Sequence, residues 1–307
     1  MVFKERPRII FVIFCTFFLV SAKTSNEKVI YGKDNRRDLF ELNNSRWIHN
    51  SRGIAALVLK RKIKNIPGYP GIVELKTEVM DDLCEDEKFY GQGQLASCSG
   101  FLVGKNLLVT AGHCIKSLKE CKKNRWVFGF DLGQEDKDYT KISKKNIYEC
   151  VEIIDYSLDD STDFSLLRLN RDVFEREPLA IREVGKVKIG EALYLGGHPS
   201  GLPLKMSGHA WVRKNSNENY FSANLDSFEG NSGGPVFNSN DHFVEGILVR
   251  GEDDYIWDDK RDCFKVKKCL DWSCSGEEVT RISAIKRLKD LINEEKFYDQ
   301  SGRFRQR

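Results

Sequence analysis

The sequence lacks a strong excess of charge of either sign. Its 49 Lys and Arg residues nearly balance 46 Asp and Glu residues, which leaves a formal net charge of +3. This balance gives no indication of nucleic acid or a membrane surface as a partner, because both select strongly basic proteins. Apolar residues make up 40% of the 307 positions, so the chain can form a large core.

Long apolar runs are missing beyond the N-terminus. The run Ile9–Val20 follows three basic residues and precedes Ser21 and Ala22. This pattern is typical of a secretory signal peptide, with Val20 and Ala22 at positions −3 and −1 of cleavage. A membrane anchor is the alternative, but 12 residues fall short of the roughly 20 that a bilayer span needs. We therefore expect residues 1–22 to be removed and the mature protein to be secreted or periplasmic, with no membrane association.

Tight Cys-x2-Cys pairs are also absent. Eight cysteines remain after the signal segment, and an even number in an exported chain indicates disulfides. The cluster Cys263, Cys269 and Cys274 leaves zinc as an alternative, although its wide spacing is unlike that of structural zinc sites. The acidic stretch 252–259 could bind calcium, but a solvated loop is the expectation. The sequence thus predicts neither a metal nor a cofactor.

The body of the chain has no internal repeat and reads as short strands. Seven apolar runs of strand length are bounded by Gly, Asn, Asp or charged residues: 54–59, 100–104, 106–111, 125–130, 164–169, 191–197 and 244–249. Many short strands with turn residues between them predict an all-β barrel or sandwich. Near the end, apolar residues at helical spacing predict an amphipathic helix over 284–297 with Ser283 as its N-cap, followed by a polar tail, 298–307.

Three separate motifs carry the chemistry. The Gly-rich stretch DSFEGNSGGP contains Ser232, the stretch CSGFLVGKNLLVTAGHC places His113 after a predicted hairpin, and DFSLLRL opens with Asp163. A serine nucleophile needs a base, and that base needs a carboxylate to fix its tautomer. The developing oxyanion needs preorganised N–H donors, which a Gly-rich turn can supply. The three residues are therefore a candidate triad.

In this order the three blocks resemble those of the trypsin-like (chymotrypsin-fold) serine peptidases. TAGHC matches the histidine block, DFSLLRL the aspartate block and GNSGGP the serine block, and the resemblance extends over about residues 50–295. It implies that Ser232 is the nucleophile, His113 the general base and acid, and Asp163 the orienting carboxylate. The N–H groups of Gly230 and Ser232 would form the oxyanion hole.

The resemblance also implies a fold and a disulfide. The family fold has two six-stranded antiparallel β-barrels, the active site in the cleft between them and a C-terminal α-helix. Cys98 and Cys114 have the family spacing for a disulfide, and Cys121–Cys150 is a further expected pair. The pairing of the other four cysteines stays open.

One departure from the animal members concerns activation. Asn231 stands where those enzymes have an Asp that pairs with a freshly cut N-terminus, and a neutral side chain cannot form that ion pair. GNSGG together with VIYGKDNRRDLFEL instead resembles the bacterial secreted, V8-like branch, which includes glutamyl endopeptidases. The peptidase domain is expected at 51–297, and residues 23–50 are either a removable pro-segment or the start of the mature domain.

The resemblance places Asp226, six residues before Ser232, at the base of the pocket for the residue before the scissile bond (P1). A buried carboxylate there would select Arg or Lys, with Ser227 and Gly251 lining the substrate site. Glu277 could fill or further acidify this pocket. Two alternatives remain: glutamyl specificity with Arg250 or His242 as the pocket cation, and a catalytically silent binding protein on the same scaffold. Protein or peptide substrates and a monomeric state are expected.

Overall fold

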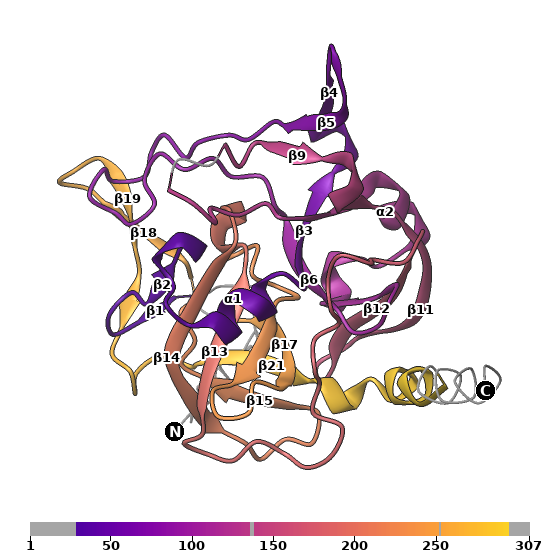
Figure 1. The fold of residues 1–307 in the computed structure, drawn as a ribbon. Helices are drawn as coiled ribbons and strands as arrows, with labels where there is room; N and C mark the ends of the chain where they lie inside the picture. Colours follow the sequence, from indigo (N-terminus) through magenta and orange to yellow (C-terminus); the bar gives the residue numbers. More distant parts are fainter. Residues whose placement is uncertain (1–28, 136–137, 252, 295–307) are drawn as a thin grey trace, which may run out of the picture.

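β-Strands of the chain form two curved antiparallel sheets that lie side by side (Figure 1). The computed structural model describes residues 29–135, 138–251 and 253–294. The signal segment 1–22 and the polar tail 298–307 lie outside these ranges, so those two expectations stay predictions.

The first sheet is built from seven strands. In spatial order these are β10 (Ile147–Tyr148), β8 (Asn124–Phe128), β3 (Ile54–Leu59), β6 (Cys98–Leu102), β7 (Leu107–Thr110), β12 (Asp163–Leu169) and β11 (Cys150–Leu158). The apolar run of β3 is continuous because both of its faces are covered. Ala55 and Leu57 pack into one core, and Ala56 and Val58 pack into another on the opposite face.

The second sheet closes on itself. Its strands, in order, are β13 (Ala192–Gly197), β16 (Pro235–Asn238), β17 (Val244–Arg250), β21 (Glu277–Arg281), β15 (Tyr220–Ala223), β14 (Lys205–Lys214) and the short β2 (Arg36–Arg37). Pairing of β13 with β14 makes a closed barrel of six strands. In the described part of the first sheet the end strands β10 and β11 do not pair, so that sheet is curled but not closed.

A shared core joins the two sheets. It contains Phe101 and Phe164 from the first sheet and Tyr194, Phe237 and Ile247 from the second. The architecture is the double barrel expected from the sequence, which confirms the predicted fold class. One detail differs, because hydrogen bonds close only the second barrel among the described strands.

Helices are few and lie at the periphery. They are α1 (Ser45–Ser51), α2 (Leu118–Lys123) and a C-terminal helix over 286–294 (Figure 1). Ile285 and Leu288 anchor the last helix in the shared core. The expected N-cap is wrong, since Ser283 lies in the preceding 3-10 turn η6 (Ile282–Ala284) and helical residues begin at 286.

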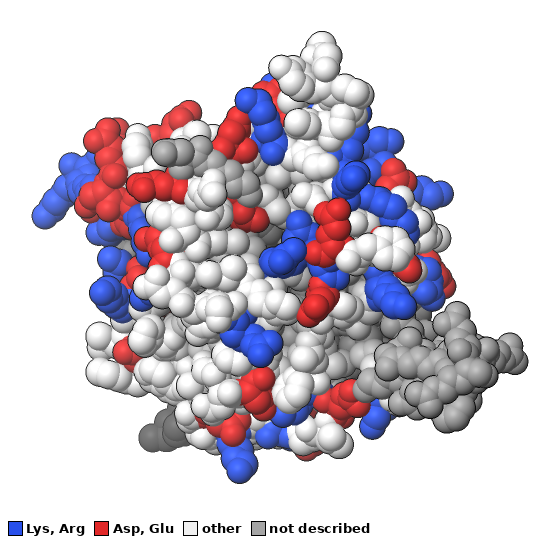
Figure 2. Space-filling view, viewed as in Figure 1, with Lys and Arg blue, Asp and Glu red and all other residues white. Residues whose placement is uncertain are grey.

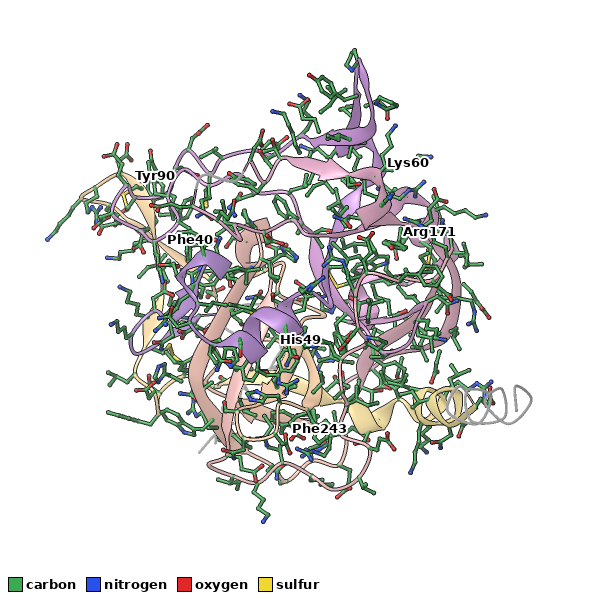
Figure 3. All side chains as sticks on the ribbon, in the orientation of Figure 1. Phe40, His49, Lys60, Tyr90, Arg171 and Phe243 are labelled. Carbon is green, nitrogen blue, oxygen red and sulfur yellow. A yellow bond between two sulfur atoms is a disulfide. The ribbon has the colours of Figure 1, made fainter. Side chains whose placement is uncertain are left out.

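Three small sheets lie outside the two barrels. β4 (Ile63–Ile66) and β5 (Tyr69–Leu75) form a hairpin that projects from the first barrel and pairs with β9 (Lys141–Ser143) (Figure 1). β18 (Tyr255–Asp258) pairs with β19 (Cys263–Val266), and β1 (Ile30–Tyr31) pairs in parallel with β20 (Lys268–Cys269). The loop after β5 runs beside the β18–β19 hairpin, where Figure 3 labels Tyr90.

Four disulfides hold these elements together. Two are the pairs expected from the sequence, Cys98–Cys114 and Cys121–Cys150. The others tie the loop after β5 to β19 through Cys84–Cys263, and close a short loop through Cys269–Cys274. The late cysteines thus form disulfides, which argues against the zinc alternative.

Positive and negative side chains are interspersed over the face seen in Figure 2, as the small net charge suggests. Acidic side chains gather around the β18–β19 hairpin. Within the described ranges, no helix combines the length and the apolar character that crossing a membrane requires.

Candidate active site

His113 and Asp163 are placed by two neighbouring strands. His113 lies in the turn η3 (Gly112–Cys114) just after β7, and Asp163 is the first residue of β12, which pairs with β7. The two side chains meet with His113 Nδ1 2.8 Å from Asp163 Oδ2. The backbone N–H of His113 donates to the other carboxylate oxygen at 3.0 Å. Both oxygens of one carboxylate therefore hold the same histidine.

This contact sets the tautomer that the chemistry needs. A proton on Nδ1 of His113 is held by Asp163, so the second ring nitrogen is left to accept a proton. The side chain of Asp163 is only 2% exposed, whereas that of His113 is 18% exposed. The carboxylate is thus shielded from water while the imidazole remains partly exposed.

Ser232 comes from a loop of the second barrel that crosses to the first. Its carbonyl oxygen accepts the backbone N–H of Ser99 on β6 at 2.8 Å. The next residue, Gly233, has φ +87° and packs so closely that an added Cβ would lie 2.1 Å from the Ser99 carbonyl oxygen and 2.9 Å from the Ala111 nitrogen. Only glycine fits that space and backbone conformation. The crossing brings Ser232 next to the main chain that leads into His113.

The Cys98–Cys114 disulfide lies under this junction. Cys114 adjoins His113 in sequence, and its sulfur lies 3.7 Å from the Ser232 carbonyl oxygen. The potential metal ligands of Cys98, His113 and Cys114 lie within 4.8 Å of one another. Because the two sulfurs are bonded to each other, they are not available as the thiolates that a transition metal would need.

A buried hydrogen-bond network supports the turn at Gly230. Ser99 Oγ donates to the Gly230 carbonyl at 2.8 Å and accepts the backbone N–H of His198 at 2.9 Å. The Ser200 N–H donates to the Glu229 carbonyl at 2.5 Å. Gly230 has φ +90°, and a Cβ there would lie 2.4 Å from the His198 carbonyl oxygen. The conformation of the proposed oxyanion turn therefore depends on Ser99 and on the 198–200 turn.

The sequence interpretation did not identify these supporting residues. Their signal is the Gly- and Pro-containing run GGHPSG, which ends β13 in the turn η5 (Pro199–Gly201). His198 in this run is structural: burial lowers its pKa to about 4, and its Nδ1 lies 3.0 Å from the Leu202 carbonyl oxygen. It is therefore neutral at physiological pH.

Asp226 is engaged by the N-terminal segment. Its side chain is buried, and its two oxygens accept the backbone N–H groups of Tyr31 and Asn35, each at 2.8 Å. Burial raises the pKa of Asp226 to about 7, although these two hydrogen bonds oppose the shift. This placement does not match the expectation of an open pocket base, because both carboxylate oxygens already have backbone partners.

The residue after Asp226 faces a second carboxylate. Ser227 Oγ donates to Glu277 Oε2 at 2.5 Å, and both residues are fully buried. The backbone N–H of Ser227 donates to the Val29 carbonyl at 3.3 Å. Buried carboxylates thus lie on both sides of the Ser227 backbone.

The N-terminal segment is integral to this wall. Val29 and Ile30 have no exposed surface, and Ile30 packs against Phe228. The guanidinium of Arg36 lies 3.9 Å from the centre of the Phe228 ring and pairs with Asp34. Val29, Ile30 and Arg36 are therefore packed into the domain, against the residues that precede Ser232.

Three further candidates fall in different places. Gly251 directly follows β17, whose strand partners are β16 and β21. The Arg250 guanidinium donates to the Asp159 carbonyl and pairs with Glu278. His242 lies 3.1 Å from the Tyr194 hydroxyl. Both possible glutamyl-pocket cations thus have polar partners of their own.

Comparisons with known proteins identify a family model and a structural neighbour. Residues 98–247 match the family model described as the trypsin-like peptidase domain. A solved structure of a Glu endopeptidase in complex with MPD aligns with a TM-score of 0.49 and 15% identity, over 87% of this chain and 99% of that one. No curated protein matches the sequence. The recognition made from the three sequence blocks is confirmed: residues 98–247 carry a trypsin-like peptidase domain, the domain of a family of proteases, which are hydrolases that act on proteins or peptides.

Proposed function

We propose that the protein is an exported, monomeric serine endopeptidase that works through Ser232, His113 and Asp163 without a cofactor. The observation that carries the proposal is the double contact of Asp163 with His113, beside the crossing that brings Ser232 to β6. The eight paired cysteines support export, because disulfides persist in oxidising compartments.

The proposed reaction follows from these roles. Ser232 Oγ attacks the scissile carbonyl while the free ring nitrogen of His113 takes its proton. The N–H groups of Gly230 and Ser232 stabilise the oxyanion, and His113 then protonates the leaving amine. A water molecule, activated by the same imidazole, hydrolyses the acyl-enzyme. The Asp163 carboxylate stabilises the imidazolium in both halves.

An active-site serine reagent tests this proposal. A fluorophosphonate should label the purified mature protein at Ser232, and Ser232→Ala should be neither labelled nor active. The catalytically silent binding protein is the competing candidate, since the scaffold alone would not activate a serine. Lack of labelling in folded, disulfide-bonded protein would favour that candidate.

A preference for Arg or Lys at P1 is the finer part of the proposal. Asp226 was its expected carrier, but the N-terminal segment occupies its carboxylate. The Ser227–Glu277 pair supports the same preference better, because it adds a buried carboxylate beside the expected pocket residue Ser227. Glutamyl specificity has less support, since Arg250 and His242 are engaged elsewhere.

Matched variants separate these possibilities. Peptides that differ only in having Arg, Ala or Glu at P1 should be cleaved in that order of kcat/KM. Glu277→Gln should reduce the Arg-to-Ala ratio about tenfold or more. Asp226→Asn should lower activity on all three peptides together. If Asp226→Asn lowers the Arg-to-Ala ratio and Glu277→Gln does not, Asp226 is the pocket base. Fastest cleavage of the Glu peptide would support the glutamyl alternative.

A further inference from the structure

A cavity of about 630 Å³ opens beside the proposed oxyanion turn. Glu229 and Gly230 form one edge, and the segment before β6, ending at Ser97, forms another. Ser200 and Tyr255 close it, and their side-chain oxygens lie 2.6 Å apart. The cavity therefore begins where the proposed oxyanion donor is and extends away from it.

Its position relates it to the leaving half of a substrate. The half before the scissile bond is expected to pass Gly251 and the Ser227 wall, and none of these residues lines the cavity. Ser97 lines it and directly precedes Cys98, whose disulfide partner Cys114 adjoins His113. The imidazole must protonate the leaving amine. Because the disulfide links the neighbour of His113 to the segment that lines the cavity, we expect the amine to leave on this side.

The lining is rich in carboxylates. The lining contains one ammonium group, that of Lys62, and four carboxylates, those of Glu78, Glu229, Asp253 and Asp254. Lys62 is paired with Glu78, so its charge is already matched. The backbone N–H of Glu229 donates to Asp254 Oδ2 at 2.7 Å, which fixes the Asp254 carboxylate at the wall.

Two of these carboxylates remain available to a ligand. Glu229 is exposed and forms no ion pair with the part of the chain that the structure describes. Asp253 is 51% exposed and lies 3.8 Å from Lys267, which is long for a strong ion pair. An excess of negative charge around a partly enclosed volume favours a cationic side chain.

We propose that this cavity is a subsite for a Lys or Arg side chain just after the scissile bond, on the leaving half of the substrate. The inference rests on the proposed serine peptidase function and deepens it. The substrate class becomes peptides with a basic residue in one of the first positions C-terminal to the cut, whatever P1 is.

Capture of the acyl-enzyme by added amines tests the subsite directly. The enzyme is acylated with a small ester that has no residues after the scissile bond. The free α-amino group of an added peptide amide then attacks the acyl carbon and loses a proton to His113. The bond between the acyl carbon and Ser232 Oγ breaks, and Oγ takes that proton. The partition between aminolysis and hydrolysis measures how well each amine binds the leaving-group side.

Amides carrying Lys in the first or second position should capture the acyl-enzyme about tenfold better than their Glu counterparts. The ratio should fall as salt is raised from about 0.05 to about 0.5 M, because the contacts are partly exposed. Equal capture of the two sets would overturn the proposal. Better capture by the Glu amides would also overturn it, and would indicate that Lys62 binds their carboxylate in the cavity.

Charge-removal variants locate the effect. The double variant Glu229→Gln, Asp253→Asn should bring the Lys-to-Glu ratio to within about twofold of unity, while ester hydrolysis changes little. Glu218→Gln is the matched control, since Glu218 is 81% exposed and pairs with Lys186 away from the cavity. A ratio that survives the double variant would contradict the assignment. Absence of both ester hydrolysis and fluorophosphonate labelling would instead reject the proposed function itself.

Discussion

The two barrels contribute to the site in different ways. The first supplies His113 and Asp163 from adjacent, hydrogen-bonded strands, so sheet register alone brings them together. The second supplies Ser232 from a loop that is held on the other barrel by Ser99 and by the close approach of Gly233. His113 and Asp163 are thus positioned by paired strands, whereas Ser232 is positioned by contacts of its loop with the other barrel. The position of Ser232 should be the more sensitive to single substitutions outside the triad.

The largest expected effect removes the nucleophile itself. Ser232→Ala should lower kcat by about 10⁴-fold or more, because the attacking atom is lost while the oxyanion donors remain. His113→Ala should be comparably inactive, and the double variant no worse than either, because the two residues act as one unit. Single-turnover peptide hydrolysis gives these values. Multiplicative losses in the double variant would show that the two residues act independently.

The next effect tests the crossing at Gly233. Gly233→Ala should reduce the free energy of unfolding by about 3 kcal/mol or more, because the new methyl group would clash with the Ser99 carbonyl. Gly91→Ala is the control, because it has φ +78° but nothing within 4 Å of the added atom. It should cost only about 1 kcal/mol. Equal losses in urea unfolding would mean that backbone conformation, and not the crossing, sets the cost.

Ser99→Ala examines the support of the oxyanion turn. The variant leaves the buried N–H of His198 without its hydroxyl acceptor and releases the Gly230 carbonyl. We expect kcat to fall about tenfold with KM little changed, and stability to fall by about 1–3 kcal/mol. Ser165→Ala is matched to it, since Ser165 is also fully buried but its hydroxyl donates to the Ile115 carbonyl. A similar drop in kcat for both variants would remove the special role of Ser99.

The last prediction concerns Asp226 and pH. Burial raises its pKa to about 7 in the folded protein from the ordinary value of 3.8, so the folded state binds the proton more tightly than the unfolded chain. The stabilisation from this proton is fully present below about pH 4 and is lost as the pH rises through about 7. The difference in unfolding free energy between the wild type and Asp226→Asn should therefore change across that range and level off above it. A difference independent of pH would mean that folding leaves the pKa of Asp226 unchanged.

Much of the framework could be predicted from sequence. Strands occur at all seven predicted runs, because their apolar residues face packed cores on one or both sides. β11 was missed because it lies at a sheet edge and mixes exposed charged and apolar residues in CVEIIDYSL. β14 was missed because it interleaves buried Met206 and Val212 with polar residues, so its apolar signal is weak.

The limits at the site have a similar cause. Motif order was enough to nominate His113, Asp163 and Ser232, since each lies in a recognisable block. The partners of Asp226 could not be predicted, because Tyr31 and Asn35 contribute only backbone N–H groups, which carry no residue signature. The network around Ser99 was missed for a related reason, since its members are scattered over three distant segments.

The contact between Tyr31 and Asp226 has a consequence for how the protein is made. It joins residues 195 positions apart, and β1 pairs with β20 still later in the chain. β1 can therefore dock only when residues as far along the chain as β20 are available. Contacts of such long range form late in folding. The wall beside Ser232 is thus completed only when β1 and β20, which are far apart in sequence, have come together.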